Sequence, residues 1–116
     1  KDLTPIKHNP ISYLWMDNTA VQDLSPLKDM PLVILRMSGT PISDLTPLAN
    51  VPLIQLNISS TRVVDLEALR DMPLRRLECK HTLIKDLSPL RNSTTLDSLI
   101  ADEELMKQWQ EMKKLD

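Results

Sequence analysis

The sequence predicts an α/β solenoid, in which similar coils stack and share one apolar column, and three observations support this fold class. A unit of 21 residues recurs with changed letters, and its copies begin at Asp2, Asp23, Asp44 and Asp65. Apolar residues and prolines return at fixed places within the copies. A fifth copy begins at Asp86 and carries one extra residue before Leu96. We therefore expect a right-handed stack of parallel β-strands joined by 3-10 coils.

Each unit predicts one short strand with one buried side. Counted from the residue after each M-P or V-P pair, the apolar positions are 1, 4, 6, 11, 14, 17 and 20. In the second coil these positions hold Leu32, Leu35, Met37, Ile42, Leu45, Leu48 and Val51. The alternation at positions 4 and 6 is typical of a half-buried strand. Position 8 holds Asn18, Gly39, Ser60 and His81 in successive coils, which predicts a tight turn after each strand.

The segment opposite each strand is predicted to form a 3-10 turn, because a period of 21 residues leaves little length for an α-helix. Prolines stand in the first turn of this segment, where a missing N–H lacks a helical partner anyway, at Pro5, Pro26, Pro47 and Pro89. The aspartates that open the copies form a ladder: Asp2, Asp23, Asp44, Asp65 and Asp86. We interpret the ladder as a set of caps that accept backbone N–H bonds. A calcium column is the alternative, but it needs further oxygen ligands that the spacing does not supply.

These patterns resemble a known family over essentially the whole chain. The motif L-x-x-L-x-[apolar]-x-x-T-x-[apolar] resembles the leucine-rich repeat, with threonine at Thr19, Thr40, Thr61 and Thr82 where the family usually has asparagine. Hydroxyl groups are therefore expected to bond the backbone of each turn. The D-L-[ST]-P-L opening is similar to bacterial internalin-type repeats, and the M-P-L joint is similar to repeats that accompany bacterial serine/threonine kinase domains. The resemblance implies recognition of a partner and attachment to a signalling or surface protein.

The two ends of the chain differ. Residues 1–101 are predicted to hold about five coils, the first incomplete, and residues 102–116 a helix that caps the last coil. In that helix Leu105, Trp109 and Met112 fall on one side, and Asp102 is placed to cap it. The strand at residues 11–16 is predicted to be an open edge. Because the chain starts with Lys1 inside a repeat, we expect a piece of a longer protein, and self-association through this uncapped edge is left open.

Composition argues against several functions. A formal net charge of -2, with acids and bases mixed, gives no nucleic-acid footprint, and no apolar run approaches the length that would insert into a membrane. One glycine excludes a glycine-rich phosphate loop. His8 and His81 occupy different coil positions far apart along the stack, so we do not expect them to form a catalytic or metal site with each other or with the single cysteine, Cys79, and we predict no enzyme activity, cofactor or metal. Localisation is left undetermined by the sequence.

The candidate site is the strand face that points away from the core, which we expect to be the concave side. Aromatic and arginine side chains, which are enriched at binding hot spots, lie on it, and the predicted partner-binding residues are Tyr13, Trp15, Ile34, Arg36, Asn57, Arg76 and Glu78. Two other interpretations of these residues remain: Arg36 stacks on Trp15 as a surface pair, or Tyr13 and Trp15 contact a preceding coil. A protein partner is expected. The alternative functions are a structural spacer or regulatory tail of a bacterial kinase, and a carbohydrate or cell-surface adhesin.

Overall fold

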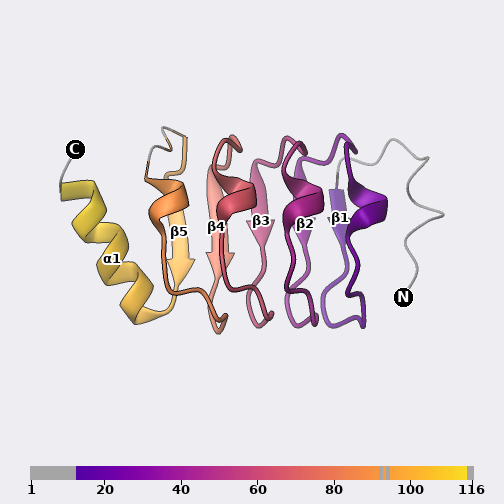
Figure 1. The fold of residues 1–116 in the computed structure, drawn as a ribbon, viewed down its shortest axis with the longest axis horizontal. Helices are drawn as coiled ribbons and strands as arrows, with labels where there is room; N and C mark the ends of the chain where they lie inside the picture. The colour runs from indigo at the N-terminus through magenta and orange to yellow at the C-terminus, as the bar shows by residue number, and fades with distance from the viewer. Residues whose placement is uncertain (1–12, 92, 94, 115–116) are drawn as a thin grey trace.

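The computed structural model describes residues 13–91, 93 and 95–114, which form one continuous stack of coils (Figure 1). Its sheet contains five parallel strands in sequence order, which are β1 Tyr13–Trp15, β2 Ile34–Arg36, β3 Gln55–Asn57, β4 Arg76–Cys79 and β5 Ser98–Ala101. Between them lie four 3-10 turns, η2 Ser25–Leu27, η3 Thr46–Leu48, η4 Glu67–Leu69 and η5 Ser88–Leu90. The predicted fold class is confirmed.

The repeat period sets the register of the strands. Tyr13 pairs with Ile34, Ile34 with Gln55, and Gln55 with Arg76, each 21 residues further along. Between β4 and β5 the offset becomes 22, with Arg76 opposite Ser98, which absorbs the extra residue seen in the sequence. Equivalent positions of neighbouring coils therefore lie side by side across the whole sheet.

The apolar positions of the repeat build one buried column. All seven predicted positions of the second coil, Leu32, Leu35, Met37, Ile42, Leu45, Leu48 and Val51, are buried. Leu14 on β1, the outermost strand described, is only partly buried although it packs against this core. Asp2, Pro5 and His8 lie outside the described residues, as do the first two residues of the strand predicted at 11–16.

The turn after each of the first four strands, β1 to β4, contains a residue with left-handed backbone conformation, in agreement with the predicted tight turn. Asn18, Gly39, Ser60 and His81 have φ values of 59, 74, 58 and 58 degrees. At Gly39 space is also short, because a Cβ atom there would clash with Asn18 Oδ1. One residue later the threonine hydroxyl donates to the carbonyl three residues back, as Thr40 Oγ1 does to Met37 at 2.7 Å. The replacement of the usual asparagine therefore leaves the turn bonded, through hydroxyls.

The helix α1, Glu103–Lys114, covers the end of the stack beside β5 (Figure 1). Leu105 is buried in the core, while Trp109 and Met112 pack against it partly exposed. The side chain of Gln108 accepts the Leu87 N–H and donates to the Lys85 carbonyl, so it takes the place of a further coil for those backbone groups. Asp102 was predicted to cap the start of the helix with its side chain. Its carboxylate instead accepts the His81 N–H at 3.0 Å and thus binds the turn of the preceding coil.

Candidate partner-binding face

The outward sheet face is the set of strand side chains that alternate with the buried ones. Its two rows contain Tyr13, Ile34, Gln55, Arg76 and Ser98, and Trp15, Arg36, Asn57, Glu78 and Ile100. All seven predicted partner-binding residues lie in these rows, so the structure brings them together on one surface. Their role in binding remains a prediction.

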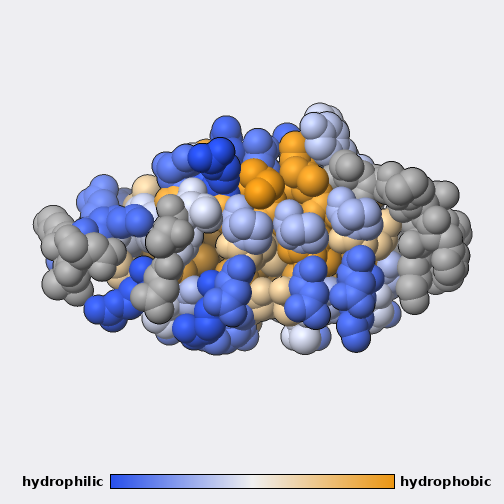
Figure 2. Space-filling view, turned by 90° about the horizontal axis from the view of Figure 1, so that it is seen from above, coloured by the Kyte–Doolittle hydropathy of each residue, from blue (hydrophilic) through white to orange (hydrophobic). Residues whose placement is uncertain are grey.

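The apolar end of this face is on β1 and β2. Tyr13 and Trp15 are 64% and 69% exposed. Ile34 is half-buried, and so are Val33 and Ile54, which directly precede β2 and β3. Figure 2 shows a hydrophobic patch beside strongly hydrophilic groups along the upper edge, on the sheet side of the molecule. Two of the three aromatic residues of the chain are thus exposed at this end of the face.

Arg36 is held on this face by its neighbours on the preceding coil. Its guanidinium carbon lies 4.9 Å from the centre of the Trp15 ring, and Nη2 lies 3.3 Å from Asp17 Oδ2. The Nε atom is enclosed without a hydrogen-bond partner. The stacking interpretation of Arg36 and Trp15 is therefore confirmed, and it orients the arginine without using most of its donors.

Asn57 has a different position from the other predicted residues. It is only 8% exposed, and its Oδ1 accepts the N–H of Ser59 at 3.0 Å. The side chain thus holds the turn after β3 and forms the floor of the face. A hollow of about 260 Å³ lies above it, lined by Ile34, Leu35, Arg36, Gln55, Leu56, Asn57, Arg76 and Glu78.

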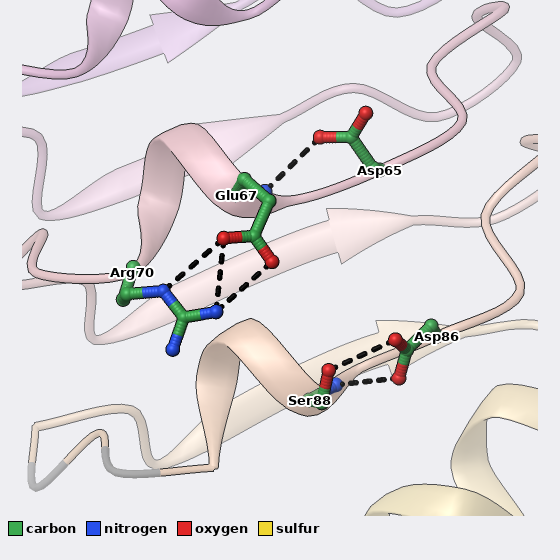
Figure 3. A network of polar contacts seen from close by, with 5 residues as sticks. All are labelled: Asp65, Glu67, Arg70, Asp86 and Ser88. Carbon is green, nitrogen blue, oxygen red and sulfur yellow. Dashed lines mark hydrogen bonds and ion pairs between the residues drawn. The ribbon is translucent and has the colours of Figure 1, made fainter.

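The aspartate ladder lies on the opposite side of the coils and caps the 3-10 turns. The N–H groups of Ser25, Thr46, Glu67 and Ser88 each donate to the aspartate two residues earlier, at 2.9 to 3.2 Å. Figure 3 shows two neighbouring caps, at Asp65 and Asp86, and the ion pair of Arg70 with Glu67. These bonds lower the pKa of Asp23, Asp44 and Asp86; the side-chain bond comes first for Asp23 and Asp44, and the backbone bond of Ser88 for Asp86. The capping interpretation is confirmed for the described aspartates.

The described residues contain no group of three or more His, Cys, Asp or Glu side chains that could hold a metal ion. Cys79 is buried, and its burial, with a smaller effect of the Asp102 charge, raises the pKa of the thiol to about 12. A thiol of that kind is a poor nucleophile at neutral pH.

None of the described helices is long and apolar enough to cross a membrane.

Three residues on or directly beside the face were not singled out from the sequence. Asp17 accepts the Ser38 N–H at 2.9 Å and pairs with Arg36, so it fixes both the turn and the arginine. Gln55 lines the hollow. Arg75, just before β4, is exposed and takes part in no ion pair within the described part of the chain. The spacing of hydrophobic residues did not reveal these three residues. It identifies where a strand lies, but it does not indicate which of the polar residues on that strand take part in a site.

No protein-family model matches the sequence, and no curated protein matches it either. Solved structures, in contrast, do match the chain. Internalin C2 from Listeria monocytogenes strain 4b F2365 is similar with a TM-score of 0.83 and 30% identity over 87% of this chain. Another internalin of that strain, inlF, gives a TM-score of 0.52 and 26% identity over 71% of this chain.

The chain spans 46% of the length of internalin C2 and 32% of the length of the second internalin, so it corresponds to part of each. The likeness rests on the same architecture described above, parallel strands alternating with 3-10 turns along one sheet. The chain has the fold of a leucine-rich repeat solenoid, similar to those of the Listeria internalins.

Proposed function

We propose that the chain is a non-catalytic interaction module that binds a protein partner through its outward sheet face. The observation that carries this proposal is the exposure of Tyr13 and Trp15, 64% and 69%, next to Ile34 and Arg36 on one continuous surface. Leaving such rings in water forgoes the free energy that their burial provides. A partner protein that covers the two rings would gain this free energy of burial.

The arrangement of the face favours binding over a purely local role. The Trp15–Arg36 stack and the Asp17–Arg36 pair hold the arginine in place before any partner arrives. Side chains that are already ordered lose less conformational entropy on binding. The likeness to internalins supports a protein-interaction module in general, and such neighbours are typically non-enzymatic.

The matched experiment replaces exposed apolar side chains on two different surfaces of the protein. One variant carries Tyr13→Ser, Trp15→Ser and Ile34→Ser on the outward sheet face. The control carries Val64→Ser and Leu83→Ser, which remove side chains of similar exposure, 56% and 54%, outside the strands. Quantitative affinity purification then compares the proteins that each variant retains.

We expect the sheet-face variant to lose a protein that the control and the unchanged chain both retain. If all three retain the same proteins, the face does not bind, and the structural spacer or kinase tail is favoured. A glycan array read with the same three proteins addresses the adhesin alternative. Glycan binding that depends on Tyr13, Trp15 and Ile34, without any lost protein, would contradict the proposal.

A further inference from the structure

The outward sheet face changes its chemistry along the stack. On β1 and β2 it offers the exposed rings of Tyr13 and Trp15 and the side chain of Ile34. On β4 it offers Arg76, with Arg75 directly before it, and both arginines are exposed. Gln55, on β3, separates the two regions without adding a charge. An apolar region and a pair of exposed arginines, with Glu78 and Asp97 as acidic neighbours, thus lie at a fixed distance on one rigid sheet.

The two arginines form few electrostatic interactions with other residues of the chain. Arg76 Nε lies 3.9 Å from Glu78 Oε2, which is longer than a hydrogen bond. Arg75 forms no ion pair with any residue that the structure describes, although Asp97 follows it in the same row of the next coil. An exposed pair at that distance stabilises the fold little. The guanidinium groups are therefore available to an incoming carboxylate, which can accept two N–H bonds from one arginine.

The register fixes the distance between the regions. Ile34 and Arg76 occupy the same row on β2 and β4, with Gln55 between them. Two strand spacings of about 4.8 Å separate them by about 10 Å. A segment in the polyproline II conformation advances about 3.1 Å per residue with three residues per turn, so two side chains three positions apart point to the same side and lie about 9 Å apart, which matches this distance.

We propose that the face binds a segment of a partner protein that carries an apolar or aromatic side chain and, about three residues away, an acidic one. The apolar side chain packs against Trp15 and Ile34, and the carboxylate reaches Arg75 and Arg76. This inference rests on the proposed function and names the chemistry of its partner. A sulfated polysaccharide would satisfy the arginines but would leave the apolar region uncovered, so the observations favour a protein segment.

Random peptides displayed on phage and selected on the whole chain test the proposal. We expect enrichment of peptides with an apolar or aromatic residue about three positions from Asp or Glu. For a selected peptide, the Arg75→Glu, Arg76→Glu variant should weaken binding by about tenfold or more, and raised salt should weaken binding to the unchanged chain. The control Arg91→Glu makes the same kind of charge change at the end of η5, on the other side of the coils, and should leave the affinity unchanged.

An Ile34→Ser variant separates this inference from the proposed function. Peptides that need Ile34, carry no acidic residue and bind the arginine variant normally would overturn the inference alone. Peptides that bind regardless of Ile34, or a failure to enrich any peptide, would overturn the inference, whereas the proposed function is overturned only if the affinity purification shows no protein that depends on the face. Retention on heparin that depends on the arginines but not on Ile34 would contradict the inference in favour of a glycan. Melting curves of each variant confirm that the comparison concerns folded proteins.

Discussion

Thr40 shows how a single hydroxyl supports one coil from inside. It is buried, and its Oγ1 donates to the Met37 carbonyl at 2.7 Å. Thr40→Val keeps the shape but removes the donor, so a buried carbonyl loses its bond and the free energy of unfolding should fall by about 1 to 3 kcal/mol. Thr19 makes the same bond to Met16 from a half-buried position, where water can replace it. Urea unfolding of Thr40→Val and Thr19→Val should therefore show the larger loss at Thr40, and equal losses would contradict this account.

The aspartate ladder predicts how stability responds to acid. Hydrogen bonds to the charged carboxylates lower the pKa of Asp23, Asp44 and Asp86 from the ordinary value of 3.8. A group whose pKa is lower in the folded state stabilises the fold above its unfolded pKa, and this stabilisation is lost as the pH falls through the folded value. The caps should thus hold at neutral pH and fail progressively below 3.8.

The triple variant Asp23→Asn, Asp44→Asn, Asp86→Asn tests this acid response. Asparagine can accept the same backbone N–H bond but does not titrate. Melting midpoints measured from neutral pH down to pH values below the ordinary aspartate pKa should fall less steeply for the variant than for the unchanged chain. Parallel curves would show that other groups govern the acid response.

At the scale of single elements, most of the structure followed from local spacing, and the exceptions have local causes. The prolines and the 21-residue period predicted the 3-10 turns correctly, and η4 forms with Ala68 where the others have proline. After η2, however, Lys28 has ψ 131 and Asp29 has φ 62, whereas Ala49 and Arg70 continue helically after η3 and η4. All copies have similar residues there, so hydrophobic spacing gave no signal for the different turn.

The cap helix α1 closes the column through one buried leucine and one glutamine. Leu105→Ala should lower the free energy of unfolding by about 2 to 5 kcal/mol, because Leu105 is buried against the last coil. Gln108→Ala should also lower the free energy of unfolding, since it removes the hydrogen-bond partner of the Leu87 N–H and of the Lys85 carbonyl.

Deletion of the chain from Asp102 onward should cause aggregation or loss of cooperative unfolding. Gln110→Ala, at an exposed position of the same helix, is the control, and unchanged solubility after the deletion would contradict a capping role.

At the scale of the whole molecule, the repeat that defines the fold also determines which residues share the candidate site. The sequence period places Tyr13, Ile34, Gln55 and Arg76 in one row, and the register confirms it. The period cannot say how far each side chain is exposed. Asn57 and Glu78 occupy the same row, yet Asn57 turns to the Ser59 N–H and is buried, while Glu78 stays half-exposed. Such choices depend on side-chain contacts between coils, which a pattern of apolar positions does not contain.

Self-association is the remaining prediction at this scale, and two surfaces could carry it. β1 is the outermost strand of the sheet among the described residues, and a parallel edge can pair with another chain through its backbone. The aromatic rings of the outward sheet face could instead pack against a second copy. We predict association through the edge, visible as a sedimentation coefficient that rises with protein concentration. The Tyr13→Ser, Trp15→Ser, Ile34→Ser variant should keep this rise, because edge pairing uses backbone groups that the variant retains. Loss of the rise in the variant would assign the association to the sheet face, and a constant coefficient for the unchanged chain would show that neither surface associates.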